Sequence, residues 1–479
     1  MTDQANVKAT KFRWTITTML FFATTINYLD RQVLSLTWTD HIVPEFHWTN
    51  SDYGNITATF SLVYAFAMLF AGRIVDWMDT KKGFLWFIFV WSIGACLHAF
   101  AGIGTSGIIT GEWFVGFEGA KNIIGNITDV ARVISVSVSL FIFARVILAI
   151  GEAGNFPAAI KATAEYFPKK DRAFSTSIFN AGATIGALLA PLTIPVIAEA
   201  YGWELSFIII GALGFIWMGF WIFVYKKPHL HPKVNEQELN YIQQDYTAEE
   251  ITAGNSKQEV SFFKTLSYRQ TWAFAAGKFM TDGVWWFFLF WTPAYLSSVY
   301  GLDSLESRPQ IFSLYAITLL SILGGWLPTY FVDKKGMNPY SGRMKAMLIF
   351  AFFPLLTLLA QPLGHISVWL PVLLIGIALA AHQSWSANIF STVGDMFPKK
   401  AIATVTGIGG MAGGIGSFII NKSSGVLFDH AKNSNMKFMG FEGIESGYFI
   451  IFIICSFAYL IGWVIMKSLV PKYAPITDL

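Results

Sequence analysis

Residues 19–36 read MLFFATTINYLDRQVLSL, a run that is apolar enough to cross a bilayer and yet places Asp30 beside Arg31. A helix needs about 20 residues to span the ~30 Å hydrocarbon core. A charged side chain at that depth costs about 3 kcal/mol even on the mildest insertion scale, and such charges usually serve a transported ion or solute. The run therefore predicts a membrane helix in a protein that moves something charged.

The composition of the whole chain is that of a membrane protein. Hydrophobic residues make up 54% of the 479 residues and charged residues 13%, whereas about 25% of a soluble domain is charged. Apolar runs of spanning length recur, and they are too uniformly apolar for the alternating ~10-residue strands of a membrane β-barrel. We therefore predict an all-α membrane protein with twelve transmembrane helices. They are expected at 14–36, 53–76, 83–103, 133–158, 173–199, 203–226, 270–298, 309–333, 344–362, 366–391, 401–428 and 446–469.

The distribution of basic residues predicts the orientation of the bundle. Most lysines and arginines fall in loops on one side, whereas the loops at 37–52, 199–204 and 361–366 hold none. Basic residues in short loops stay in the cytoplasm. Both termini are therefore predicted to be cytoplasmic, as an even number of spans requires.

The chain divides into two halves of six predicted helices each. The longest polar break is a linker at 227–268, between an N-terminal bundle at 1–226 and a C-terminal bundle at 269–479. The motif FPKK at 167–170 recurs at 397–400, an offset of 397 − 167 = 230 residues. A four-residue match in a basic loop can arise by chance, but further identities follow at the same offset without a gap. We therefore expect two pseudo-symmetric halves that arose by duplication.

Further charges lie inside the predicted spans. Arg145 and Glu152 are seven residues apart, so they share one face of their helix. Lys278 and Asp282 are four residues apart and can pair along theirs. The simpler interpretation is that these charges neutralise one another as structural ion pairs. The alternative is that they line a path through the membrane.

The types of charged residue indicate which solute would suit such a path. Two arginines that face one site can hold a carboxylate through paired hydrogen-bond donors. Carboxylates beside them can take up a proton or, equally, coordinate sodium. The pattern therefore favours coupled movement of an organic anion and a cation, with the proton as the expected coupling ion and sodium not excluded.

Several motifs resemble those of the anion:cation symporter family of the major facilitator superfamily. They are NYLDR at 27–31, GEAGNFP at 151–157 and YFPKKDRA at 166–173, and the resemblance covers nearly the whole chain. Within that family the chain is similar to bacterial hexuronate transporters, through the pair in the seventh span and AHQ at 381–383. The resemblance implies the major facilitator fold and import of a hexuronate, such as glucuronate or galacturonate, across a bacterial inner membrane with protons.

The same resemblance implies roles for individual residues. Arg31 would hold the substrate carboxylate, Asp30 would pair with Arg145 and take part in proton coupling, and Glu152 would be the principal proton carrier. The tyrosines, Tyr64 above all, can instead be packing residues, and His382 and Gln383 of the tenth span can instead bond neighbouring helices. The other expected substrate-binding residues are Tyr28, Tyr64, Arg145, Lys278, Asp282, His382, Gln383 and Asn388.

Other classes of function are less well supported by the sequence. It has no metal-ligand spacing, nucleophile elbow or nucleotide-binding loop, so we expect neither an enzyme nor a cofactor, no nucleic-acid partner, and a monomer in the lipid bilayer. Another organic anion, such as an aldonate or an aromatic acid, remains an alternative substrate. A transporter-like sensor is disfavoured because neither tail holds a signalling domain. The segment at 104–132 is an insertion without an assigned role, expected on the outer surface as an amphipathic piece.

Overall fold

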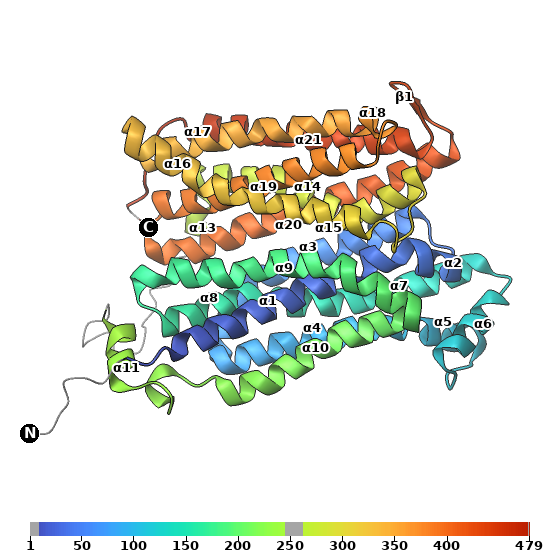
Figure 1. The fold of residues 1–479 in the computed structure, drawn as a ribbon, viewed down its shortest axis with the longest axis horizontal. Coiled ribbons are helices and arrows are strands. Elements are labelled where there is room, and N and C mark those ends of the chain that lie inside the picture. Colours follow the sequence, from blue (N-terminus) through green and yellow to red (C-terminus); the bar gives the residue numbers. More distant parts are fainter. Residues whose placement is uncertain (1–8, 245–261, 478) are drawn as a thin grey trace, which may run out of the picture.

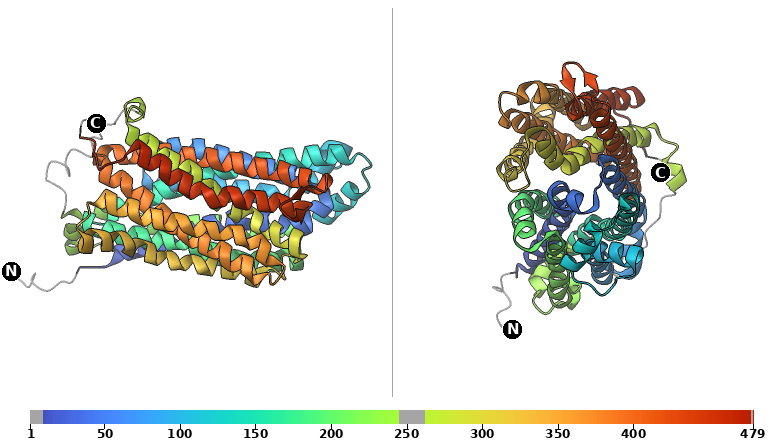
Figure 2. Two further views of the ribbon diagram at one scale, coloured as in Figure 1. Left: turned by 90° about the horizontal axis from the view of Figure 1, so that it is seen from above. Right: turned by 90° about the vertical axis from the view of Figure 1, so that its right-hand side faces the viewer.

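The computed structural model describes residues 9–244, 262–477 and 479, which form a bundle of long helices. Figure 1 shows these helices side by side along the long axis of the molecule, with both chain ends at the same end of the bundle. We call that end the terminal face and the opposite end the distal face. The end-on view in Figure 2 separates the helices into two groups, one from each half of the chain.

The N-terminal half holds the first six spans. Its fourth span is broken beside Gly154 into two helices, and the second of these runs to residue 166, beyond the expected end at 158. The helices of this half are α1 (Phe12–Thr37), the π-helical turn η1 (Trp38–Ile42), α2 (Val43–Phe46), α3 (Asn50–Met78), α4 (Thr80–Ala99), α5 (Ala101–Thr110), α6 (Phe117–Gly125), α7 (Val130–Glu152), α8 (Asn155–Tyr166), α9 (Lys169–Tyr201) and α10 (Trp203–Val224).

The C-terminal half repeats this plan, and its eighth and ninth spans are interrupted by 3₁₀ turns. Before its last helix, a two-stranded antiparallel hairpin pairs Lys437 with Glu442. The elements of this half are α14 (Arg269–Tyr300), α15 (Arg308–Ile317), η3 (Thr318–Ser321), α16 (Ile322–Lys335), α17 (Pro339–Phe352), η4 (Phe353–Leu359), α18 (Ala360–Gly364), α19 (Trp369–Met396), α20 (Lys399–Asn433), β1 (Lys437–Phe438), β2 (Phe441–Glu442) and α21 (Ile444–Leu469).

The predicted all-α fold with twelve spans is confirmed. Among the described residues, nine helical segments are long and apolar enough to cross a membrane. The remaining three spans, α1, α14 and α20, have 26, 32 and 35 residues. Two of them, α1 and α14, each carry two charges inside the predicted spans, and α20 carries a series of glycines. These residues lower the hydropathy of the three helices, and α14 is buried at every residue of 283–296.

Close helix packing in the N-terminal half depends on glycine. A side chain at Gly151 would place its Cβ 2.2 Å from the backbone nitrogen of Trp91, well inside van der Waals contact. Glycine there lets α7 approach the backbone of α4, as small residues do in membrane bundles. This approach positions Glu152, the next residue, inside the bundle.

The first part of the linker is fixed to the N-terminal half. It comprises η2 (Pro228–Leu230) and α11 (Glu236–Gln243), while α13 (Phe262–Thr265) precedes α14 and residues 245–261 lie outside the described residues. Glu238 of α11 is fully buried, and its carboxylate accepts hydrogen bonds from the backbone amides of Phe12 (3.0 Å) and Arg13 (3.1 Å). Its Oε1 also pairs with Arg13 Nη1 at 3.0 Å. Because the first amides of a helix lack partners inside the helix, this clasp completes the start of α1.

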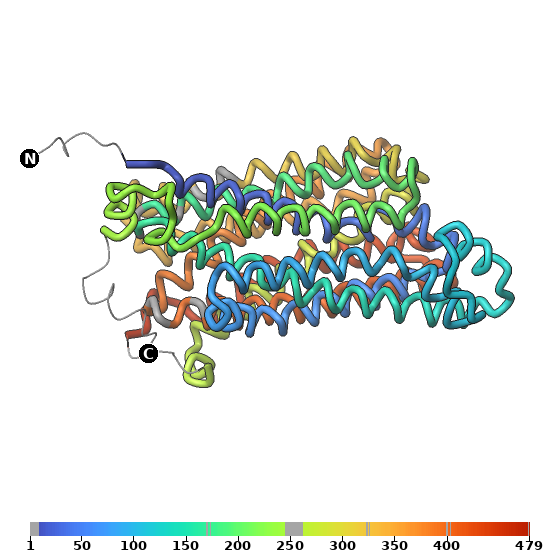
Figure 3. The backbone as a smooth tube through the Cα atoms, turned by 90° about the horizontal axis from the view of Figure 1, so that it is seen from below, coloured from blue at the N-terminus to red at the C-terminus, as the bar shows by residue number. Residues whose placement is uncertain are grey.

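The insertion at 104–132 forms a helical projection. α5 and α6 extend past the ends of the other helices at the distal face, as Figures 1 and 3 show. Trp113 and Phe114, between the two helices, are exposed. The segment is built from two short helices and the start of α7. Its expected location on the outer surface of the membrane stays a prediction.

Hydrogen bonds join the two halves at the distal face. Asp429 of α20 accepts from the backbone amides of Asn50 (2.9 Å) and Ser51 (2.6 Å), the first two residues of α3. Asp40 accepts from the amide of Ser304 at 2.6 Å in a second inter-half contact. We call the bonds between Asp429 and the start of α3 the distal latch. A carboxylate at a helix N-terminus is favoured by the helix dipole as well as by its hydrogen bonds.

Asp429→Asn should weaken the distal latch, because an amide group presents donors where the aspartate presents only acceptors. Hydrogen bonds to a charged group contribute about 1.5–3 kcal/mol, so we expect the population with a separated distal face to rise roughly tenfold. The measurement is the distance distribution between spin labels at Arg132 and Met439, exposed residues of the two halves near that face.

Glu442→Gln is the matched control, since this carboxylate pairs with Lys437 at 2.6 Å within its own half. It should leave the distribution unchanged. Equal distributions in the Asp429→Asn variant and the parent would show that the latch does not hold the halves together.

Candidate functional site

An ion pair between Arg31 and Glu152 lies inside the bundle. Arg31 Nε donates to Glu152 Oε2 at 2.8 Å, and Nη2 donates to the same oxygen at 2.5 Å. Arg31 is 2% exposed and Glu152 is fully buried. Among the described residues, Glu152 Oε1 has no hydrogen-bond partner. The pair therefore satisfies the charges of both residues and leaves one carboxylate oxygen unused.

Aromatic rings surround the Arg31 guanidinium. Its central carbon lies 5.0 Å from the ring centroid of Tyr28, 5.0 Å from that of Tyr64 and 5.6 Å from that of Phe60. A fourth ring, Trp286 of α14, lies 4.7 Å away. These distances are within the ~6 Å range of cation–π attraction. We call the four rings the aromatic enclosure; their π faces favour a cation at this position.

The predicted pair of Asp30 and Arg145 is not formed. Both residues are 2% exposed, yet within the described part of the chain neither oxygen of Asp30 and neither Nε nor Nη1 of Arg145 has a hydrogen-bond partner. Adjacent residues on a helix point about 100° apart. Arg31 faces Glu152, so Asp30 points in a different direction, and its buried carboxylate has no hydrogen-bond partner among the described residues.

Arg145 nevertheless lies beside the enclosure. Its guanidinium carbon is 5.5 Å from the ring centroid of Phe60, the same ring that contacts Arg31. The seven-residue spacing predicted that Arg145 and Glu152 share a helix face, and the structure places both of them at this site. Phe60 was not predicted as a site residue. Its position four residues before Tyr64, on the same face of one helix, was the signal that could have identified it.

The charged pair of the C-terminal half is formed as the spacing predicts. Lys278 Nζ lies 2.7 Å from Asp282 Oδ2, and both side chains are largely buried. The ammonium also lies 4.3 Å from the ring centroid of Phe390. A Cβ at Gly413 would lie 2.2 Å from Asp282 Oδ2, so glycine in α20 makes room for the carboxylate.

The predicted polar residues of the tenth span make contacts within the C-terminal half. His382 Nδ1 lies 2.7 Å from the Tyr459 hydroxyl, and its ring stacks on Trp285 at 5.2 Å. Asn388 Nδ2 donates to the carbonyl of Gly324 at 3.1 Å. Gln383 is half-buried on the same helix. For His382 the structure shows the interhelical hydrogen bond of the alternative interpretation, and Asn388 makes one as well. Contact of either residue with a substrate stays a prediction.

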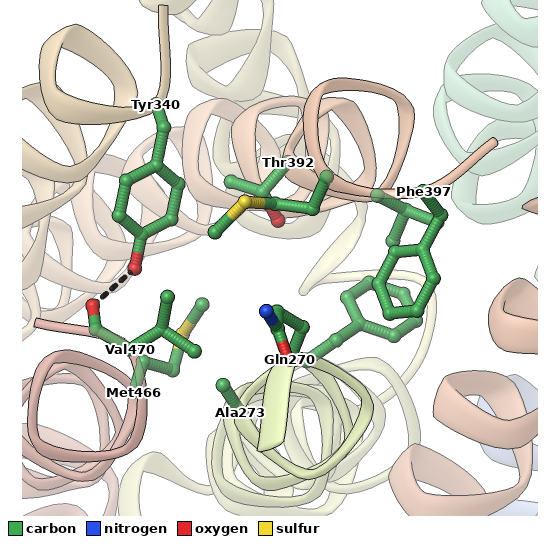
Figure 4. Close-up of a pocket in the computed structure, with 10 residues that line it drawn as sticks. Gln270, Ala273, Tyr340, Thr392, Phe397, Met466 and Val470 are labelled. Carbon is green, nitrogen blue, oxygen red and sulfur yellow. Dashed lines mark hydrogen bonds between the residues drawn. The ribbon is translucent and has the colours of Figure 1, made fainter. Parts of the chain in front are cut away.

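A pocket near the terminal face is separate from these charges. Figure 4 shows it between α14, α17, α19 and α21, where the Tyr340 hydroxyl donates to the carbonyl of Val470 at 2.7 Å. Its lining is mostly apolar and includes Phe274, Met396 and Met466. None of the predicted site residues lines it, and it offers no charged group to an anion.

Comparison with known proteins identifies the family. The family model described as the Major Facilitator Superfamily matches residues 20–420. The hexuronate transporter of Escherichia coli strain K12 is 27% identical over 426 residues, which cover 87% of this chain and 88% of that protein. The galacturonate transporter of Dickeya chrysanthemi is 28% identical over 324 residues, which cover 67% of this chain and 82% of that protein.

A solved structure supports the fold. The inward-facing, unoccupied structure of a bacterial homologue of the human lysosomal transporter Spinster superposes with a TM-score of 0.67 at 17% identity, covering 98% of this chain and 100% of that one. At this identity the likeness concerns the fold alone. Together with the family match over most of the chain and the transporter relatives, it shows that this membrane protein is a transporter, not an enzyme, and that the chain belongs to the Major Facilitator Superfamily.

Proposed function

We propose that the chain is a secondary transporter that imports a hexuronate together with protons across the bacterial inner membrane. The observation that carries the proposal is the buried Arg31–Glu152 pair beside Arg145, whose Nε and Nη1 have no hydrogen-bond partner among the described residues. A buried, arginine-rich site suits a monocarboxylate. The curated relatives named for hexuronate and galacturonate support a sugar acid as the ligand.

Coupling follows from competition for Arg31. Glu152 in its ionised form occupies both Nε and Nη2 of the arginine, so an incoming carboxylate would meet donors already in use. A proton on Glu152 breaks the ion pair and frees these donors for the substrate. Proton binding therefore strengthens anion binding, and by linkage anion binding strengthens proton binding to the same extent.

The remaining charges complete this scheme. Arg145 offers its unpaired donors to the second oxygen of the substrate carboxylate, and a proton on Asp30 would neutralise a buried group that has no hydrogen-bond partner among the described residues. Lys278 and Asp282 form the polar part of the site in the other half. The polar side chains of both halves would form hydrogen bonds with the hydroxyls of the sugar. They are Tyr28, Tyr64, His382, Gln383 and Asn388.

The direction of access follows from the predicted orientation. With both termini in the cytoplasm, the terminal face is inside and the distal face outside. The distal latch then closes the outer side. This arrangement therefore corresponds to a stage after the substrate has entered and before the site opens to the outside again. Rocking of the two halves about the site would give alternating access, as in other transporters built from repeats.

The test is uptake of labelled galacturonate by the purified protein in liposomes. An inwardly directed proton gradient should drive saturable accumulation, glucuronate should compete, and neutral galactose should not. Galactonate and galactarate in the same competition assay separate a hexuronate from other sugar acids. Accumulation driven only by a sodium gradient would refute proton coupling, and equal competition by galactose would refute recognition of the carboxylate.

A further inference from the structure

Trp286 belongs to the C-terminal half but completes a site of the N-terminal half. The other three rings of the aromatic enclosure, Tyr28, Phe60 and Tyr64, come from α1 and α3. Trp286 comes from α14, and its ring centroid lies 5.6 Å from that of Phe60 and 5.6 Å from that of Tyr64. The Arg31 guanidinium is thus enclosed by rings from both halves.

Further inter-half contacts continue from Trp286 toward the distal face. Phe290, one helical turn later on α14, packs on Trp286 with centroids 5.4 Å apart, and its carbonyl accepts from the Tyr53 hydroxyl at 2.7 Å. Tyr53 packs edge-on against Trp291 at 4.9 Å. Beyond this layer lies the distal latch. Trp286 is therefore the innermost member of a series of contacts that leads from the distal face to Arg31.

We propose that Trp286 is the lid of the anion site and a positioning residue for Arg31. While the distal face is closed, its indole covers the guanidinium from the side of the opposite half. When the halves separate at that face, Trp286 moves with α14 and uncovers Arg31. This inference rests on the proposed function for its ligand, but the lid itself follows from the inter-half contacts.

The lid has a second consequence for substrate binding. When Glu152 takes a proton, Arg31 loses its ion pair, and only the faces of the four rings and an arriving carboxylate remain to hold the guanidinium. The indole is the strongest cation–π partner among the aromatic side chains. Removing it should therefore weaken anion binding as well as closure, whereas another aromatic ring should preserve much of both.

Two substitutions at Trp286, to phenylalanine and to leucine, distinguish the effect of an aromatic ring over Arg31 from the effect of packing alone. Trp286→Phe keeps a ring over Arg31, while Trp286→Leu fills space without one. We expect KM for galacturonate to rise about tenfold in the leucine variant and about twofold in the phenylalanine variant. We also expect the leucine variant to shift the spin-label distances between Arg132 and Met439 toward separation, even without substrate.

Trp285→Leu is the matched control, because the neighbouring indole stacks on His382 within its own half. It should leave the distance distribution unchanged. The lid is refuted if Trp286→Leu changes neither KM nor the distances, if it and Trp286→Phe behave alike, or if Trp285→Leu gives the same shift. Should the parent protein not transport galacturonate, the proposed function fails, while the distance measurement still decides for or against the lid.

Discussion

Glu152→Gln will abolish proton-driven accumulation of substrate while leaving exchange of substrate across the membrane. Glutamine imitates the protonated carboxylate, so it cannot form the ion pair that occupies Arg31 at 2.5 and 2.8 Å. The site then accepts the anion but carries no proton with it. Concentrative uptake into liposomes under an acid-outside gradient should fall to background, and counterflow of labelled galacturonate should persist.

Glu45→Gln is the matched control for this prediction. Glu45 is another buried carboxylate, outside the membrane-spanning helices, where burial raises its pKa to about 7. It accepts a hydrogen bond from Trp203 Nε1 at 2.8 Å, which a glutamine oxygen can also accept. This variant should still concentrate substrate. If vesicles with Glu152→Gln do the same, Glu152 is not the proton carrier.

Arg31→Lys will remove high-affinity binding of the anion, although the charge is kept. A lysine ammonium cannot present two parallel donors to a carboxylate, and it lacks the planar face that packs against the four rings. Truncating one partner of a buried, hydrogen-bonded charge pair costs about 2–5 kcal/mol, and because lysine keeps the charge we expect a cost near the lower end of this range. We therefore expect binding of galacturonate, followed by calorimetry or thermal shift, to weaken by at least about thirtyfold.

Arg13→Lys serves as its control, because Arg13 also pairs with a buried carboxylate, Glu238 at 3.0 Å, but at the terminal face. It should bind the anion as the parent does. Wild-type affinity in Arg31→Lys would show that the substrate carboxylate is held elsewhere.

The sequence predicted the structure correctly wherever a regular periodicity determines which residues form a helix or lie side by side on it. Lys278 and Asp282 pair because residues four apart on a helix are neighbours, and the apolar runs located all twelve spans. The pairing of Asp30 with Arg145 was expected from the family resemblance, and it is not formed among the described residues. The sequence of one helix does not show how that helix is rotated within the bundle, and the rotation of α1 directs Arg31 toward Glu152.

The inter-half contacts were beyond the reach of sequence patterns. Trp286 lies in a run of four aromatic residues, 285–288, in which every face of the helix is apolar, so periodicity gives no preference for one ring. Asp429 lies one residue beyond the predicted eleventh span, 401–428, and its role depends on the register between α3 and α20. Such contacts are set by how two separately folded bundles meet.

The clasp formed by Glu238 decides where the polypeptide can be divided. A fragment that stops before α11 would leave the leading amides of α1 without acceptors at the membrane surface, whereas one that continues through Gln244 brings its own cap. The first half of this transporter thus keeps the acceptors for the first amides of α1 only when it includes part of the connecting segment. Fusion partners, affinity handles or protease sites belong after that helix, not before it.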